Sequence, residues 1–407
     1  MKITAVAILC LMASASLLAQ DDSVEARLRA LEEQVADLKK ENMQLRRDLG
    51  LEVMARQSSV KMSGRSEGIQ IGGLLQAQTE DGDRGDSRFT DSNARAYLRR
   101  ARVNLSGRFL EEFNVRAELE LAGSLANTTG FRAQLTDAYL NWNRFDSANI
   151  RVGQFKTPFG FEQLYADPCL YTAERSLVSD RLTPGRQIGV QLGGEFFDER
   201  VHYSAGLFNG SGTNQNFNDN DRFLTAGRVS VVPLTGRFLE NQARWTVGVN
   251  GFRSTDSNIT LPAEFGFDST PASPAKDNIF AGRRRAIGYD TQVEIGPFEL
   301  WAEYLRGTFE AANRVPALRF HSDGWSVQAS YYVLFDKLQL VERLEVFDPS
   351  DVENLGANAA GTRSLVSGVN WYFKQHDLKL QVDWMRTSVP GLPKAQSKLI
   401  ARLQTVF

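Results

Sequence analysis

The sequence predicts an all-β protein: a transmembrane antiparallel β-barrel of about 16 strands, preceded by an N-terminal α-helical coiled coil. Two observations predict the barrel. Apolar and polar residues alternate with a period of two over residues 68–407, and the connections between these segments are short and long in turn. Outer-membrane barrels have short periplasmic turns, long external loops and an even number of strands. A soluble β-sandwich has no reason to keep this alternation of loop lengths.

The first 19 residues are predicted to be a secretory signal peptide. Lys2 precedes the apolar run 3–13, which small residues follow, and cleavage is expected after Ala15 or Ala19. No other apolar run approaches the roughly 20 residues of a membrane helix. Export together with the barrel pattern predicts a place in the outer membrane of a Gram-negative-type bacterium. Only Cys169 would remain after processing, so no intrachain disulfide is expected.

Residues 21–52 are predicted to form a periplasmic coiled coil. Apolar residues step by four and three, and an asparagine takes an a position of the heptad, where it helps to fix register. The seam consists of Val24, Leu28, Leu31, Val35, Leu38, Asn42, Leu45 and Leu49. A helix packed on its own domain would have a broader apolar stripe, so an oligomerising coiled coil is favoured. Residues 53–67, which are polar, are predicted to be a linker.

The barrel is predicted to occupy residues 68–407. Its strands are expected near 69–79, 94–108, 114–122, 134–142, 149–156, 186–196, 201–209, 222–233, 244–252, 284–295, 298–309, 322–333, 338–347, 363–373, 377–386 and 397–407. Each is near the length that a tilted membrane strand needs. The connection 234–243 is expected to be longer than the other short turns, and 253–283 is expected to be a long loop.

Alternation within the strands assigns two faces. In 377–386 the residues Leu378, Leu380, Val382 and Trp384 share one face, and Lys379, Gln381 and Asp383 share the other. In the same way Arg100, Arg102 and Asn104 are expected to face inward, as are Lys398, Arg402 and Gln404 of the last strand.

The longest connection, 157–185, is predicted to be a constriction loop. It is too long for a hairpin turn, and its apolar residues alternate with charges. Long loops in compact domains are usually functional. We expect it to fold into the lumen and narrow it. The alternative is an ordinary packed surface loop.

Several ordered motifs resemble the phosphate-selective porin O and P family. They are GQFKTPFG (153–160), ERSLV (174–178), PGRQIG (184–189) and YSAGLFNGSG (203–212), with LRRAR (98–102) and LTDAY (135–139) before them. The resemblance covers roughly residues 68–407. It implies a sixteen-stranded, trimeric barrel in the outer membrane that passes small anions such as phosphate. The coiled coil lies outside the resemblance and would help to hold the trimer.

An anion filter needs several basic side chains that converge in a narrow lumen, and arginine adds bidentate geometry to its charge. The candidate pore-lining residues are Arg100, Arg102, Arg151, Lys156, Arg175, Arg181, Arg186 and Arg402. The alternative is that these charges pair with acids across the wall. Acidic and basic residues are equal in number after residue 52. Arg175 in particular could pair with Glu162 or Glu174.

Enzyme functions are not predicted. The three histidines, His202, His321 and His376, lie in unrelated contexts, and neither a metal-ligand spacing nor a nucleophile motif is present, so no metal or cofactor is expected. A net charge of −2 and export argue against a nucleic-acid partner. Two hypotheses follow: a passive porin for small hydrophilic solutes, in particular anions, and a structural barrel that tethers the envelope with little transport.

Overall fold

The computed structural model describes residues 59–60, 66–89, 94–123, 133–267, 278–314, 317–352 and 361–407. The predicted signal peptide 1–19, the predicted coiled coil 21–52 and most of the linker 53–67 lie outside these residues. Val53–Phe407 forms one compact unit, and the description below concerns that unit alone.

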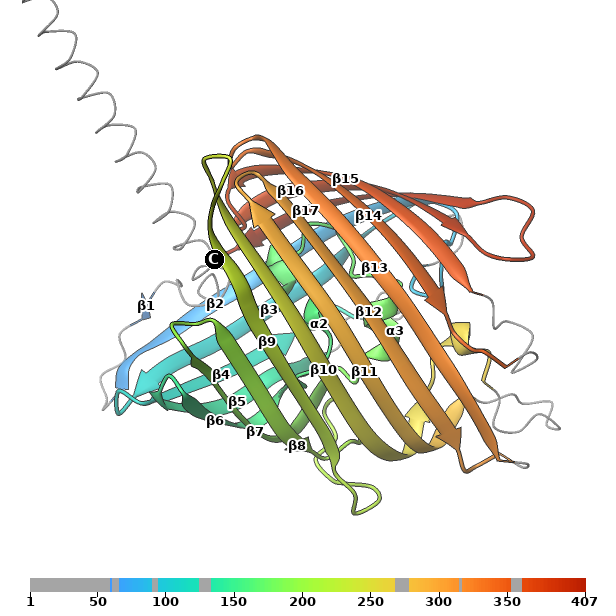
Figure 1. Cartoon of the computed structure of the whole chain (residues 1–407), viewed down its shortest axis with the longest axis horizontal. Coiled ribbons are helices and arrows are strands. Elements are labelled where there is room, and N and C mark those ends of the chain that lie inside the picture. Colours follow the sequence, from blue (N-terminus) through green and yellow to red (C-terminus); the bar gives the residue numbers. More distant parts are fainter. Residues whose placement is uncertain are drawn as a thin grey trace, which may run out of the picture. The chain divides into compact units, whose positions relative to one another are not determined.

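Within these described residues, sixteen long strands follow one another (Figure 1). They are β2 (Ser66–Gly82), β3 (Arg95–Phe109), β4 (Phe113–Glu120), β5 (Gln134–Phe145), β6 (Ala148–Lys156), β7 (Arg186–Phe196), β8 (Val201–Phe208), β9 (Leu224–Phe238), β10 (Asn241–Thr260), β11 (Ile279–Ile295), β12 (Phe298–Ala311), β13 (Leu318–Leu334), β14 (Leu338–Asp348), β15 (Thr362–Lys374), β16 (Leu378–Ser388) and β17 (Gln396–Val406). The two-residue strand β1 (Ser59–Val60) pairs with β2.

The strands close into a barrel. Each pairs antiparallel with the next, and β17 returns to β2 with Arg402 opposite Gln78. The chain end extends this pairing, because Gly73 N donates to the Phe407 carbonyl (2.8 Å) and Phe407 N donates to the Gly73 carbonyl (3.1 Å). Closure satisfies the backbone groups that an open edge would leave unpaired, as a membrane requires. The predicted all-β barrel of sixteen strands is confirmed.

The two faces of the wall differ as the alternation predicts. On β3, Val103 and Leu105 are 43% and 46% exposed, whereas the alternate residues Arg102 and Asn104 are buried. The same contrast appears on β17, where Leu399 and Leu403 are exposed and Lys398 and Arg402 are buried. An apolar outer face and a polar inner face are typical of a membrane barrel.

Two predicted connections are shorter than expected. The prediction of a connection over 234–243 is wrong, because β9 continues to Phe238 and β10 begins at Asn241. Only Leu239 and Glu240 form the turn, with φ of 46° and 65°, and two positive φ values suit the right-handed twist of a hairpin. Likewise β10 and β11 extend into the expected loop 253–283, to Thr260 and from Ile279.

Short helices occupy two of the long connections in the described residues. Segment 157–185 contains α2 (Phe161–Leu164), the 3-10 helix η1 (Asp167–Cys169) and α3 (Leu177–Leu182), and Thr157 N donates to the Gly185 carbonyl (3.0 Å) where it leaves the wall. A further 3-10 helix, η2 (Ala263–Phe265), follows β10. Within the described ranges, no helix has the length and apolarity needed to cross a membrane.

An apolar cluster on the inner face joins α3 and η2 to the wall. Its aromatic members are Phe155, Phe159, Phe208, Phe252, Phe265, Phe267, Phe280, Phe309, Phe320 and Phe347. The Phe265 ring lies 5.3 Å from that of Phe309 and 5.9 Å from that of Phe347. These contacts bury apolar side chains of two external connections and fix both against the same strands.

Candidate functional site

Segment 157–185 is hydrogen-bonded to inward-facing side chains of strands far apart in the barrel. Gly160 N donates to Asn250 Oδ1 on β10 (3.1 Å), and Lys379 Nζ on β16 donates to the Leu170 carbonyl (2.6 Å). The segment has little regular structure of its own to satisfy its backbone groups, so side chains of the wall do this instead.

Three arginines converge on one carboxylate of the segment, Asp167. Arg102 Nη1 lies 2.6 Å from its Oδ2 and Arg100 Nη2 lies 3.2 Å from its Oδ1, while Arg175 Nη1 also donates to Oδ1. Asp167 is 3% exposed. Asp167, rather than Glu162 or Glu174, is thus the carboxylate partner of Arg175, whose other donors bond the carbonyl oxygens of the segment.

A second carboxylate, Glu174, receives two arginines. Arg99 binds it through both Nε (2.7 Å) and Nη2 (2.8 Å), and Arg402 Nη2 lies 2.5 Å from its Oε1. Arg402 is fully buried and also donates to the Ala173 carbonyl and to Gln78 Oε1. We call these seven residues the arginine cluster: Arg99, Arg100, Arg102, Asp167, Glu174, Arg175 and Arg402.

The charges of the arginine cluster keep both acids ionised. Burial alone would raise the pKa of Asp167, but Arg100, Arg175 and Arg102 outweigh burial and hold the pKa well below its usual range. For Glu174 burial also opposes ionisation, and Arg99 and Arg402 likewise lower the pKa below its usual range.

Arg99 was not among the predicted residues, because simple alternation turns it away from Arg100. A β-bulge in β3 changes this: Gln76 pairs with Arg100 while the next residue, Ala77, pairs with Leu98. The extra residue, Arg99, therefore faces inward beside Arg100. Nothing in the local sequence marks the bulge.

Arg343 on β14 was also missed. Its Nη1 donates to Thr172 Oγ1 (2.5 Å) and to the Glu174 carbonyl (2.8 Å), and lies 3.4 Å from Glu162 Oε1. Alternation along 338–347 could have identified it as inward-facing. Arg343 and Glu345 stand two residues apart, so they share one face of the strand, and both are charged.

Three predicted residues lie on β6 and β7, outside the arginine cluster, and of these Lys156 is directly opposite Arg186. Lys156 Nζ donates to the Tyr165 carbonyl (2.9 Å), and the Arg186 Nε donates to Asp137 Oδ1 (2.8 Å). The Arg151 guanidinium lies 4.6 Å from the centre of the Tyr139 ring, a cation–π contact. Lys156, Arg151 and Arg186 are partly exposed, unlike Arg100, Arg102, Arg175 and Arg402.

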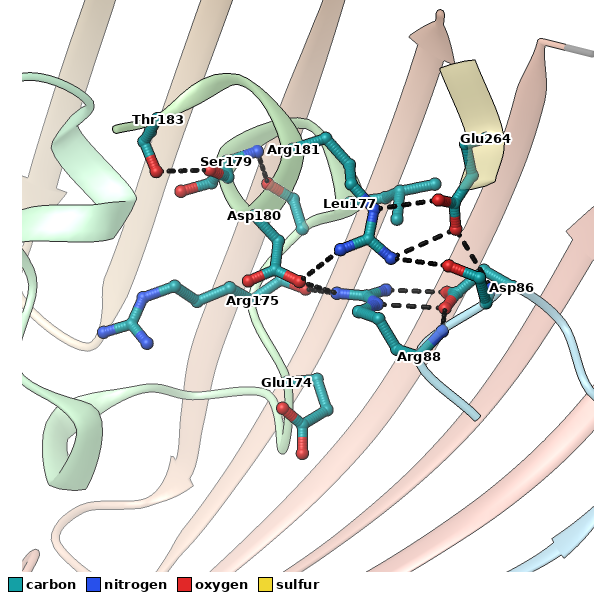
Figure 2. Close-up of polar contacts among 12 residues, drawn as sticks. Asp86, Arg88, Glu174, Arg175, Leu177, Ser179, Asp180, Arg181, Thr183 and Glu264 are labelled. Atoms are coloured by element: carbon teal, nitrogen blue, oxygen red, sulfur yellow. Dashed lines mark hydrogen bonds and ion pairs between the residues drawn. The ribbon is translucent and has the colours of Figure 1, made fainter. Parts of the chain in front are cut away.

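Arg181 lies in a different place, a junction of three external connections (Figure 2). It donates to both oxygens of Glu264 on η2 (3.1 Å each) and to Ser87 Oγ (2.9 Å). Beside it Arg88 is paired with Asp86 (2.8 Å) and donates to the Arg175 carbonyl (2.7 Å). Because it joins 83–89, α3 and η2, we call this group the loop junction.

The charges of the loop junction favour ionised Glu264. Burial would raise its pKa, but the charge and hydrogen bonds of Arg181 and the hydrogen bond from Ser87 lower the pKa to about 2. Away from the loop junction, burial raises the pKa of the Cys169 thiol on η1 to about 11, so this thiol stays protonated at neutral pH. Over the described part of the chain, no three His, Cys, Asp or Glu side chains gather as a metal site would need.

Solved structures share this architecture at low sequence identity. An outer-membrane protein of Vibrio cholerae, OmpT, is 13% identical, covers 86% of this chain and 100% of its own, and aligns with a TM-score of 0.58. The anion-selective porin from Comamonas acidovorans is 10% identical, covers 83% and 99%, and aligns at 0.55. The outer-membrane channel DcaP of Acinetobacter baumannii is 13% identical, covers 86% and 99%, and aligns at 0.55.

Comparison of the sequence with family profiles assigns the chain to a family. None of the curated proteins compared with this chain matches it. The profile of the family "Phosphate-selective porin O and P" matches residues 69–402. The match covers nearly the whole barrel and includes every residue of the arginine cluster. The chain therefore belongs to the phosphate-selective porin O and P family of outer-membrane channels.

Proposed function

We propose that this porin conducts small hydrophilic anions, phosphate among them, through a lumen that segment 157–185 narrows. The observation that carries the proposal is the charge of the arginine cluster. Five guanidinium groups face two carboxylates there, an excess of three positive charges. If Glu118, Glu120 and Arg116 beside Arg102 are included, the excess is still two. Basic rings of this kind select anions in pores.

The basic residues would have two different roles, anchoring of the segment and contact with the solute. The buried members of the arginine cluster anchor the segment and supply a fixed positive potential, which acts strongly in a water-poor channel. Lys156, Arg151 and Arg186 are more accessible and would contact the solute directly. Arginine suits this role because its planar fork matches phosphate oxygens.

The assembly and the N-terminal region belong to the same proposal. One of the similar solved proteins, OmpT of Vibrio cholerae, is described in a trimer form. We infer a homotrimer here as well, with the segment 21–52 as a periplasmic coiled coil that helps to hold the three copies together. The alternative, a barrel that tethers the envelope, predicts little conductance.

The test is the reversal potential of the purified protein in a planar bilayer across a KCl gradient, followed by titration with phosphate. We expect an anion-selective reversal potential and a current that phosphate reduces. The double variant Arg151→Gln with Lys156→Gln should move the reversal potential toward zero. Arg237→Gln, which alters an exposed residue near the β9–β10 turn, is the control and should not move it.

Two results would contradict the proposal. A cation-selective potential without phosphate block would mean that the channel does not select anions. Absence of any conductance would instead favour the tether, in which case deletion of residues 21–52 should abolish an envelope phenotype while the barrel still assembles.

A further inference from the structure

The outer surface of β7–β11 carries a groove whose floor consists of alanine and glycine residues. One row of paired residues crosses five neighbouring strands. In order around the wall, it consists of Leu192, Ala205, Gly227, Gly251 and Ile287. The three middle positions are small and the two ends are bulky, so the row forms a depression. The groove has a volume of about 1160 Å³, opens to the outside of the wall, and presents a mainly apolar surface.

The glycine at the centre of this floor is not required by the backbone. Gly251 has extended conformation, and a Cβ added there would meet only the Ala286 carbonyl, at 3.4 Å. A larger residue would therefore fit the fold, and it would fill the groove. Exposed apolar residues on the next rows, Leu207, Val229 and Val249, continue the apolar surface on both sides.

Four exposed arginines stand at one end of the groove. Arg253 on β10 is directly opposite Arg285 on β11, Arg283 lies two residues further along the same face, and Arg222 precedes β9. They line one pocket together with the exposed Phe223. This is the end from which the long connection after β10 emerges, which is the external side of an outer-membrane barrel.

The neighbouring groups leave this cluster electropositive. Arg285 is bonded to Glu310 (2.8 Å), and Arg253 donates to the hydroxyl of Thr225 (3.0 Å). Like charges directly opposite each other on paired strands destabilise a sheet. An anion that bridges Arg253 and Arg285 would remove this repulsion and add charge-assisted hydrogen bonds.

We propose that this surface binds one anionic lipid of the outer leaflet, with its phosphate among Arg222, Arg253, Arg283 and Arg285 and an acyl chain in the groove over Gly227 and Gly251. The chemistry indicates a phosphorylated lipid, because the cationic cluster and the apolar groove are continuous and both face the membrane. The inference rests on the outer-membrane location of the barrel, not on its anion selectivity. A second copy of the chain would cover the apolar groove but would not account for the four exposed arginines at its end.

Native mass spectrometry of the full-length protein in detergent tests this. The probes are a dioleoyl phosphatidic acid, the dioleoylglycerol that lacks only its phosphate, and inorganic phosphate. The phosphorylated lipid should bind at least about tenfold more tightly than the unphosphorylated one, since hydrogen bonds to charged groups are lost without the phosphate. The double variant Arg253→Gln with Arg285→Gln should lose roughly tenfold or more in affinity for the phosphorylated lipid alone.

Gly251→Leu should weaken the binding of both lipids, because it fills the groove and leaves the arginines in place. The matched controls are Arg237→Gln and Gly236→Leu, near the β9–β10 turn, where a Cβ on Gly236 meets no atom within 4 Å. The reversal potential of all four should equal that of the unmodified protein, which separates this proposal from the porin function.

Three outcomes would overturn the proposal. The first is unchanged lipid affinity in the double arginine variant. The second is competition by inorganic phosphate at the same concentrations as the lipid, which would mean that the acyl chain adds nothing. The third is a change in oligomer mass in Gly251→Leu with lipid binding unaffected, which would identify the groove as an interface between copies.

Discussion

Arg99 and Arg100 are consecutive residues of β3, yet both side chains point inward and each binds a different carboxylate of segment 157–185. Arg99 is paired with Glu174 (2.7 Å) and Arg100 with Asp167 (3.2 Å). The β-bulge that places Arg99 between the partners of Gln76 and Ala77 makes this possible. One strand therefore fixes both ends of the 167–174 stretch, and the final strand adds Arg402 from the other side of the barrel seam.

The first prediction concerns Glu174→Gln. The change leaves Arg99 and Arg402 buried without their shared carboxylate, and breaking a buried ion pair costs roughly 3–5 kcal/mol. We expect the segment to leave the wall for a larger part of the time, while the barrel stays closed. The reporter is Cys169, whose burial and raised pKa of about 11 make it unreactive in the native protein. Alkylation of Cys169 at neutral pH, followed by mass spectrometry, should be faster in the variant.

The control for this experiment is Glu112→Gln. Glu112 pairs with Arg144 at the surface (3.3 Å), where the two side chains are 34% and 58% exposed and an ion pair contributes about 0–1 kcal/mol. Its Cys169 labelling rate should equal that of the unmodified protein. Equal rates in Glu174→Gln as well would mean that the arginine cluster does not hold the segment.

The second prediction is an acid-induced loosening of the loop junction. The pKa of Glu264 is about 2 in the folded protein and about 4.3 in an unfolded chain. Since the folded pKa is the lower one, the stabilisation is complete above about pH 4.3 and is lost as the pH falls toward about 2. The difference corresponds to something on the order of 3 kcal/mol. We expect single-channel current noise to rise between pH 5 and about 2, as the external connections separate.

The variant Glu264→Gln serves as the comparison for the pH titration. It lacks the titrating group, so its noise should already be high at pH 6 and should change less on acidification. If the variant and the unmodified protein are equally quiet at pH 6, the Arg181–Glu264 contact does not hold the connections together.

Much of the barrel could be predicted from the sequence, because the physical signal is local. The predicted strand 186–196 has the same bounds as the observed one, since Ile188, Val190, Leu192 and Phe196 alternate with polar or small residues between a Pro-Gly pair and a turn. The connection 234–243 was misjudged, because a type of turn with two positive φ values was formed by Leu239 and Glu240 rather than by Asn and Gly. Strand continuation through such residues depends on pairing with the neighbour, which the local sequence does not encode.

The candidate site was less predictable, for a different reason. Inward-facing arginines such as Arg100 and Arg402 follow from the period of two, but their partners do not. Arg402 and Glu174 are 228 residues apart, and only the closed barrel brings them together. The partner of Arg181 could not be predicted either. Its local sequence resembles that of the other charged residues in the segment, but it contacts Glu264 on another connection.

The third prediction concerns Gly153 of the GQF motif. Its φ is 129°, and an added Cβ would lie 2.1 Å from the Ala138 carbonyl oxygen on the neighbouring strand. Gly153→Ala should therefore destabilise the barrel by at least roughly 1–3 kcal/mol, the cost of such a backbone conformation, with the steric clash in addition. The urea midpoint of unfolding in detergent measures this. Gly236→Ala, where a Cβ meets no atom within 4 Å, should stay within about 0.5 kcal/mol, and an equal loss in both variants would contradict the explanation.

The fourth prediction separates charge from geometry at Arg402. Its guanidinium is fully buried and bonds three groups at once: Gln78, the Ala173 carbonyl and Glu174. Lysine would keep the positive charge, but one ammonium group cannot reach acceptors on three sides, and each buried acceptor left unpaired costs about 1–3 kcal/mol.

Arg402→Lys should therefore speed the alkylation of Cys169 while the reversal potential stays anion-selective. Arg144→Lys alters an exposed guanidinium that pairs with Glu112, and it should change neither the alkylation rate of Cys169 nor the reversal potential. If Arg402→Lys shifts the reversal potential but leaves Cys169 protected, the residue acts on the solute rather than on the segment. Arg402 would then have to be grouped with Lys156 and Arg151 as a solute contact, since the geometry of its guanidinium toward the solute, and not its bonds to the segment, would be the property that matters.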